Sequence, residues 1–365
     1  MPTVKSETAS GSQQRCRTRV LRVTWRQHRT LIAVVVVVML AAAVTLTVLE
    51  QLYAHSPGPV GSGREPWWVR ITGLALQAAQ LGAGLLPLLL GAFVGAGVVA
   101  RESEHGTTTL AFTQSVPRRK WCGAKIVVVF IPVTAASVLL ALAAREQPAY
   151  VGAREGRFAF EHFTTTPLIA SLTTFTALLA GATIALWVRS QLAASAVTMI
   201  VLLVFGTAIA SYLRPHYAAP SVHVMSVEAA VRDGQYPLGD ADRGTHDAWT
   251  LSYDYVTAEG RALPSLWAAC PWHGDWPMPP EPRAGEPSAQ FATRQAEYEE
   301  LHRITQNDYH EYLAACFRGH GADRYEIRYH ANSQFWRFQL TEAGLLVLVI
   351  TGLLAPMRTG LRRLT

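Results

Sequence analysis

Two cysteine–histidine pairs in the last third of the chain have residue types and spacings that suit a chemical site. His273 follows Cys270 and His320 follows Cys316, which gives the patterns C-x2-H and C-x3-H. Thiolate and imidazole groups at such short spacings are common ligands of structural zinc. The two cysteines can instead form a disulfide in an oxidising compartment, or stay unpaired. Because eight histidines fall between residues 214 and 335, such pairs arise easily by chance, so we expect a disulfide and keep unpaired thiols and a metal site as alternatives.

Motifs of nucleotide-binding and hydrolytic enzymes are absent from the sequence. It contains no phosphate-binding G-x-x-x-x-G-K-[ST] loop, no zinc-binding H-E-x-x-H pair and no G-x-S-x-G turn. The apolar blocks before residue 214 hold no Asp, Glu or His that would relay protons. We therefore expect no enzymatic activity, no catalytic or metal-binding residue and no cofactor bound by this chain.

Glu342 is the one acidic residue that lies in an apolar block. Either it sits at the membrane interface and reaches water, or it acts as a gate or substrate contact inside the membrane. Both interpretations depend on how the surrounding chain is placed.

Six apolar blocks determine the fold class. Five of them contain no charged residue and reach the roughly 18 residues that a membrane-crossing helix requires. The sixth is shorter and needs the preceding turn, Phe338–Thr341, to span the bilayer. The expected fold is an all-α polytopic membrane protein with six transmembrane helices. The blocks are Leu31–Leu49, Ile71–Ala100, Ile126–Ala144, Thr164–Val188, Leu192–Leu213 and Ala343–Met357.

The distribution of Lys and Arg predicts the orientation. If both termini are cytoplasmic, 16 basic residues near the spans lie inside and 5 lie in the two short outer loops. The net charge of +6 is then explained by topology and by contact with anionic lipids, so it does not indicate nucleic-acid binding. The basic lead-in is about 30 residues long and the first apolar run is longer than a signal peptide's, which disfavours a cleaved signal.

The expected organisation follows from these spans. Residues 1–30 form a cytoplasmic tail and an interfacial amphipathic helix, and 31–213 hold the first five helices with a cytoplasmic loop at 101–125. Residues 214–337 form an extracytoplasmic domain of α-rich or mixed structure. Residues 338–357 form the sixth helix and 358–365 a cytoplasmic tail.

The segment before the first span has an amphipathic pattern. Arginines recur at helical spacing on one face, and Leu21, Trp25, His28 and Ile32 fall on another. This pattern indicates a helix in the inner headgroup layer, with Trp25, Arg26, His28 and Arg29 as its interfacial residues. A simple basic flank that fixes topology is the alternative.

The stretch Gly91–Lys125 is longer than a plain connection between two membrane helices. It contains a charged turn at Arg101–His105, a glycine at Gly106 and a short helix-like piece at Thr107–Ser115. We interpret it as a docking surface on the cytoplasmic side. A solvated linker with incidental charges is the alternative.

This stretch resembles the membrane subunits of type-2 ABC exporters. The similar pattern is a glycine-rich helix end, then A-R-E-x-E-x-G-T-T-x-L, then T-Q-S-V-P-R-R-x-W and a lysine. In this sequence the two motifs run from Ala100 to Trp121, and the lysine that follows them is Lys125. Thr24–Arg29 resembles the N-terminal interfacial helix of one bacterial branch of that family, and Phe335–Gln339 resembles its lead-in to the last span.

The resemblance implies a six-span permease of the cell membrane that pairs with a second copy or a paralogue. A separate cytoplasmic ATPase subunit would bind ATP and dock on the loop and on the N-terminal helix. Membrane lipids would be the remaining partners. The residues to which the resemblance assigns the docking role are Arg101, Glu102, Glu104, His105, Gly106, Thr107, Leu110, Phe112, Gln114, Arg118 and Arg119.

The connection between the fifth and sixth spans departs from the family pattern, because it is usually short and here exceeds 100 residues. This insertion leaves the substrate and its route open. The expected function is export of an unknown substrate, driven by ATP hydrolysis in the partner. A membrane-anchored sensor or assembly factor that acts through the inserted domain is the main alternative, and a polytopic membrane enzyme is a third.

Overall fold

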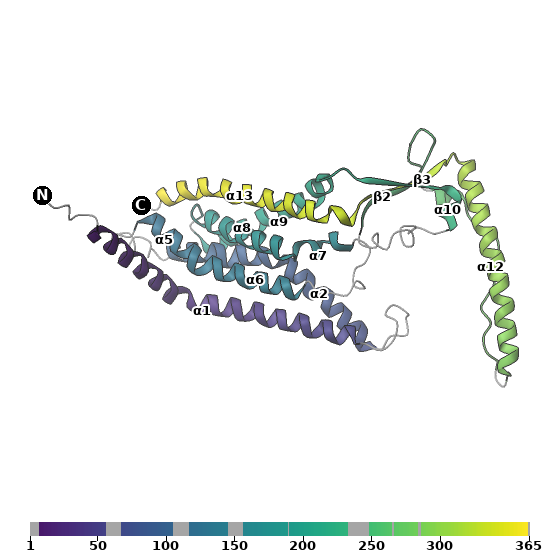
Figure 1. Ribbon diagram of the computed structural model, residues 1–365, viewed down its shortest axis with the longest axis horizontal. Coiled ribbons are helices and arrows are strands. Elements are labelled where there is room, and N and C mark those ends of the chain that lie inside the picture. Colours follow the sequence, from purple (N-terminus) through teal and green to yellow (C-terminus); the bar gives the residue numbers. More distant parts are fainter. Residues whose placement is uncertain are drawn as a thin grey trace. The chain divides into compact units, whose positions relative to one another are not determined.

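The computed structural model describes residues 7–55, 67–104, 117–144, 156–188, 190–232, 248–264, 266–283 and 286–363 (Figure 1). The chain divides into two units. Unit 1 comprises Met1–Ala218 and Ser333–Thr365, and unit 2 comprises Ala219–Asn332. The second unit is therefore an insertion between the fifth and sixth predicted spans.

Six helices in the described part of unit 1 are long and apolar enough to cross a membrane. They pack around a core in which η1 and α3 contact α8, and α6 contacts both α1 and α8. Many of their outward side chains are aliphatic and exposed, as expected for surfaces that face lipid. The elements of these six helices are α1 (Glu7–Ala54); α2 (Trp67–Leu89), η1 (Leu90–Gly95) and α3 (Ala96–Glu104); α5 (Arg118–Lys125), η2 (Ile126–Phe130) and α6 (Ile131–Ala143); α8 (Pro167–Ala185); α9 (Gln191–Ala208), η4 (Ile209–Leu213) and η5 (Arg214–His216); and η8 (Asn332–Gln334) with α13 (Phe335–Arg363).

The first and last helices are longer than the sequence indicated. The predicted interfacial helix is not a separate element, because α1 continues without a break from Glu7 to Ala54. Its 48 residues give a length of about 72 Å, well beyond a bilayer core of about 30 Å. Likewise, α13 remains helical through Arg363, so residues 358–363 extend the sixth helix and do not form an irregular tail.

A close helix contact explains the glycines of the second span. A Cβ atom on Gly91 or Gly95 would collide with the backbone of α8, and one on Gly181 would collide with the backbone of η1. The wider π turn of η1 lies at this contact. Gly91 and Gly95 therefore allow close packing within the chain.

Unit 2 has mixed α and β structure. Strands β1 (Ser221–Ser226), β3 (Arg324–His330) and β2 (Trp249–Val256) form an antiparallel sheet in the order β1-β3-β2. The helices are α10 (Val227–Arg232), α11 (Leu266–Ala269) and α12 (Ser288–Gly319). Buried side chains from the sheet and helices form one core around Tyr255, Leu313, Phe317 and Ile327. Of the two options that the sequence allowed for this segment, the mixed one is correct.

Candidate functional site

The predicted docking loop lies in the sequence between the end of α3 at Glu104 and the start of α5 at Arg118. Five of its predicted residues lie on these two helices: Arg101, Glu102, Glu104, Arg118 and Arg119. The other six, which are His105, Gly106, Thr107, Leu110, Phe112 and Gln114, lie outside the described residues.

Glu102 is the centre of a buried polar cluster at the root of this loop. The residue is only 7% exposed, and its carboxylate is 2.7 Å from Lys125 Nζ. It also accepts hydrogen bonds from Gln27 Nε2 at 2.7 Å and from Trp121 Nε1 at 3.1 Å. His28 Nε2 lies 3.7 Å from the same carboxylate. One side chain therefore joins α1, α3 and α5, and we call these five residues the Glu102 junction.

Lys125 completes the charge balance of the junction. It is 3% exposed, donates to the backbone carbonyl of Val98, and places its ammonium 4.3 Å from the centre of the Trp121 ring. A buried charge is tolerated only when it is paired and its remaining hydrogen-bonding groups are satisfied. Glu102 and Lys125 meet this condition, because each is the counter-charge of the other.

This arrangement changes the role expected for Glu102. Its carboxylate contacts groups of its own chain, so the structure does not present it as a direct contact for a partner. Glu104, Arg101 and Arg119 are exposed, and Glu104 Oε2 accepts a weak hydrogen bond of 3.4 Å from the backbone N–H of Gln191. Sequence reasoning missed Gln27, Trp121 and Lys125 as partners of Glu102. A lysine at the start of an apolar run was the available signal, because such a charge needs a counter-charge.

The predicted interfacial residues also divide into exposed residues and one buried residue. Trp25 is half-exposed, and Arg26 and Arg29 are exposed, whereas His28 is 8% exposed and faces Glu102. The N-terminal part of α1 therefore has an inner face that packs on the junction and an outer face that carries arginines and Trp25.

The C-terminal end of α13 is attached to the same end of unit 1. Arg118 Nη1 donates to the carbonyl oxygens of Leu361 at 3.4 Å and Arg362 at 3.1 Å. Trp187, in the turn between α8 and α9, donates from Nε1 to the carbonyl of Pro356 at 3.2 Å. Carbonyls in the last turns of a helix have no partner within the helix, so Arg118 stabilises the end of α13.

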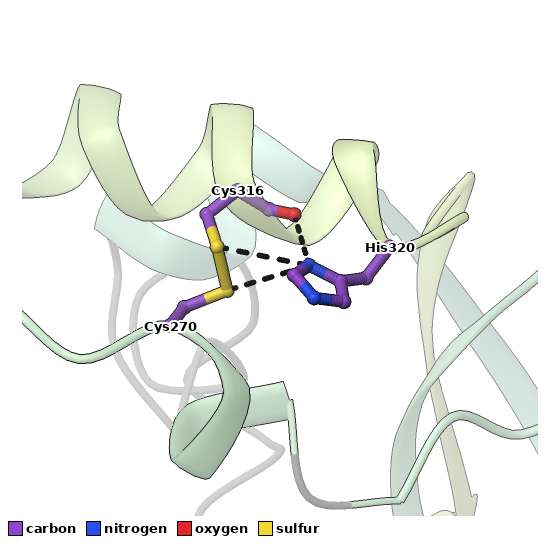
Figure 2. A group of neighbouring side chains, drawn as sticks. All are labelled: Cys270, Cys316 and His320. Atoms are coloured by element: carbon purple, nitrogen blue, oxygen red, sulfur yellow. Dashed lines mark hydrogen bonds between the residues drawn. A yellow bond between two sulfur atoms is a disulfide. The ribbon is translucent and has the colours of Figure 1, made fainter.

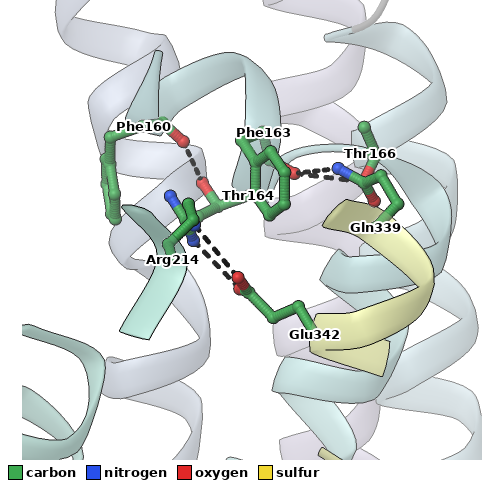
Figure 3. Close-up of polar contacts among 7 residues, drawn as sticks. All are labelled: Phe160, Phe163, Thr164, Thr166, Arg214, Gln339 and Glu342. Carbon is green, nitrogen blue, oxygen red and sulfur yellow. Dashed lines mark hydrogen bonds and ion pairs between the residues drawn. The ribbon is translucent and has the colours of Figure 1, made fainter. Parts of the chain in front are cut away.

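A second buried polar cluster joins the end of the fifth span to the sixth (Figure 3). Arg214 donates to Glu342 through two bonds, Nε to Oε2 at 3.0 Å and Nη2 to Oε1 at 2.9 Å. Their side chains are each 6% exposed. The guanidinium also lies 4.0 Å from the centre of the Phe163 ring. The interpretation of Glu342 as a residue that reaches water is therefore wrong. The predicted domain boundary also changes, because Arg214 belongs to unit 1 and not to the inserted domain.

Gln339 and Tyr217 extend this second cluster. Gln339 is fully buried; it donates to the carbonyl of Phe163 at 3.2 Å and accepts from the Thr166 hydroxyl at 2.7 Å. Tyr217 packs against Phe338, and burial, reinforced by the negative charge of Glu342, raises the pKa of its phenol to about 12. The cluster thus fixes α13 to the α7–α8 region, where α7 is Phe160–Thr164.

In unit 2, Cys270 and Cys316 are joined in a disulfide (Figure 2). His320 Nδ1 lies 3.8 Å from the sulfur of Cys270 and 3.7 Å from that of Cys316, and donates to the carbonyl of Cys316 at 2.9 Å. These three residues are the group in the described part of the chain close enough to hold a metal ion. Sulfurs bonded to each other supply no thiolate, so this arrangement is not that of a zinc site. His273 does not belong to the group.

Comparison with known proteins identifies the family of this chain. Residues 31–214 match the family model described as ABC-2 membrane transporter related. No curated protein and no solved structure matches the chain. The matched region covers just over half of the chain and extends from within the first of the six apolar helices to near the end of the fifth. The chain therefore belongs to the ABC-2 membrane transporter related family.

Proposed function

We propose that this chain is the membrane-spanning permease subunit of an ABC exporter. Its family and its six apolar helices make it a multi-pass protein of the cell membrane and a permease of the ABC transporter type. Such permeases generally have no enzymatic activity and typically work with a cytoplasmic ATPase. The proposal adds that transport is outward, and that ATP is bound and hydrolysed by a separate ATPase subunit.

The observation that carries the proposal is the Glu102 junction. The segment between Glu104 and Arg118 is flanked by α3 and α5. The Glu102–Lys125 ion pair joins these two helices, and Glu102 also accepts a hydrogen bond from Gln27 of α1. A displacement applied to this segment by a partner would move α1, α3 and α5 together and would not merely bend a loop. Helices joined in this way can move as a rigid body, which is one of the known ways in which a local displacement becomes a large conformational change.

The exposed charges beside the junction support docking at this site. Arg101, Glu104 and Arg119 offer both signs of charge to a partner, and charge-assisted hydrogen bonds are among the strong contacts of an interface. We propose that the ATPase contacts these residues and the loop between them, and that Glu102 supports the surface from within. A second copy or a paralogue of the permease would complete the transporter.

The proposed topology places both termini in the cytoplasm and unit 2 outside. The excess of basic residues in the segments assigned to the inside supports it, as does the disulfide, because disulfides persist in oxidising compartments.

A pull-down of the intact chain from its native membrane in mild detergent tests the proposal. An ATPase subunit should be recovered with the unchanged chain and lost with Glu104→Lys combined with Arg119→Glu. Glu299→Lys combined with Arg303→Glu, at exposed positions of α12 in unit 2, is the matched control and should retain the ATPase.

Two results would contradict the proposal. If no ATPase is recovered with the folded chain, the proposed permease has no ATPase partner. A sensor or assembly role for unit 2 then becomes the better explanation. If the α12 control loses the ATPase while the loop variant retains it, docking through the loop is wrong.

A further inference from the structure

A groove of about 650 Å³ lies on the surface of unit 1 between α1 and α6. This volume is within the range of roughly 300–1,000 Å³ found for small-molecule sites. The groove is separate from the Glu102 junction and from the Arg214–Glu342 cluster, because no residue of either lines it. Its walls are formed by Trp25, Arg29, Thr30, Ile32, Ala33, Val36 and Pro132.

The groove has one cationic end and one apolar end. Arg29 lies at the cationic end, and Arg26 and Arg22 continue the same face of α1 on the preceding turns, because residues 22, 26, 29 and 33 follow helical spacing. All three arginines are exposed, and none forms an ion pair with an acidic residue in the described part of the chain. From Leu31 onward the helix is apolar, and the groove continues along Ala33 and Val36 to Pro132.

We propose that this groove binds one anionic phospholipid. The phosphate group would lie beside Arg29 and Arg26, and an acyl chain would lie along Ala33, Val36 and Pro132. Trp25, which is half-exposed at the cationic end, suits the boundary between headgroups and acyl chains. The lipid would hold α1 at one depth in the bilayer, which a helix of 48 residues does not define by its length. This inference does not depend on which partner docks at the loop.

A second copy of the chain is a less suitable occupant. Subunits of a symmetric membrane dimer are related by an axis along the membrane normal, so each residue meets the partner at its own depth. A contact centred on this groove would place the arginines of one copy against those of the other. An anionic lipid headgroup neutralises them instead.

Quenching of Trp25 fluorescence by brominated lipids tests the proposal on the full-length protein in detergent micelles. The Trp25 signal is obtained as the difference between the unchanged chain and Trp25→Phe. Brominated phosphatidylglycerol should quench it at much lower concentration than brominated phosphatidylcholine does. Arg29→Gln should weaken the phosphatidylglycerol effect about five-fold, the change expected for one surface charge near anionic lipid.

Two further variants distinguish lipid binding in the groove from general attraction between arginines and anionic lipid. Arg358→Gln removes an exposed arginine near the end of α13 and should leave the quenching unchanged. Ala33→Phe fills the apolar end with all arginines in place and without a second tryptophan, and it should abolish the preference for the anionic lipid. Equal quenching by both lipids, or equal losses with Arg358→Gln and Arg29→Gln, would overturn the proposal. Efficient cross-linking of two copies through Ala33→Cys in membranes would assign the groove to a dimer contact and would overturn it as well.

Discussion

At the scale of single residues, the two buried ion pairs have the clearest consequences. Glu102 with Lys125 and Arg214 with Glu342 each bring opposite charges together in surroundings where an unpaired charge is costly. The sequence made Glu342 noticeable because it interrupts an apolar block. It did not reveal the partner, because Arg214 lies 128 residues earlier, at the end of the preceding span.

The Arg214–Glu342 pair predicts that each single substitution costs more than the double one. Glu342→Leu leaves the Arg214 guanidinium buried without its counter-charge, so the cost to stability should be about 3–5 kcal/mol. Arg214→Met leaves the Glu342 carboxylate in the same position and should also destabilise the chain. The double variant should approach the stability of the unchanged chain. Thermal unfolding of the four proteins in mild detergent measures these differences, and a double variant that loses as much stability as the two single variants together would contradict the prediction.

Tyr255 predicts an alkaline limit for unit 2. Burial raises the pKa of its phenol to about 12, against about 10 in an unfolded chain. Between these values the folded state keeps a proton that the unfolded state has lost, so stability should fall as the pH rises from about 10 to about 12. Tyr255→Phe should remove this part of the pH dependence, as followed by unfolding monitored by circular dichroism. Tyr253→Phe, at an exposed position of the same strand, is the control and should leave it unchanged.

At the scale of secondary-structure elements, close contact between η1 and α8 organises the membrane part. Such contact requires small residues because lipid provides no hydrophobic drive for helices to associate. The glycines of the second span were visible in the sequence, but their partner on α8 was not, since Gly181 is an ordinary residue of an apolar run.

Gly181→Ala should therefore disrupt folding of unit 1. Its added methyl group would collide with the backbone oxygen of Gly91, which cannot move aside as a side chain can. Gly206→Ala is the matched control, because nothing lies within 4 Å of the added atom. The control should be neutral or gain up to about 1 kcal/mol from helix propensity. The yield of monodisperse protein after detergent extraction distinguishes the two variants.

The disulfide joins α12 to the segment after α11 across 46 residues of sequence. By the chain-entropy estimate, closing a loop of this length stabilises unit 2 by about 4 kcal/mol. Replacing both Cys270 and Cys316 by Ser should lower the unfolding temperature of unit 2 and leave the membrane helices folded, because the two units have separate cores. Circular dichroism combined with limited proteolysis checks this result. A loss of helicity in unit 1 as well would contradict it.

At the scale of the whole molecule, the sequence predicted the number of spans well and their limits less well. A charge-free run of about 20 residues has few alternatives to a membrane helix, so six helices follow from hydropathy. The extension of α1 to Glu7 and of α13 to Arg363 was not predictable in this way, because polar residues are equally compatible with a helix or a tail. The sequence allowed mixed structure in unit 2 but did not locate its strands, because β1 pairs with β3 about 100 residues later in the sequence.

Labelling with a membrane-impermeant maleimide tests the proposed topology. In chains with Cys16 and Cys122 replaced by Ser, a cysteine introduced at Ser288 should react in intact cells. One introduced at Arg358 should react only after the membrane is permeabilised. Both positions are exposed, so accessibility within the protein does not explain a difference. Reaction of the Arg358 position in intact cells would mean that the end of α13 lies outside.

The Arg214–Glu342 pair also bears on how the chain is made. During synthesis, the end of the fifth span is complete long before α13, because all of unit 2 lies between them. A newly made α13 carries a carboxylate that is costly to place in hydrocarbon. Arg214 offers that carboxylate a counter-charge at the end of a helix that is already in place. We therefore expect that correct insertion of the last helix depends on prior insertion of the fifth.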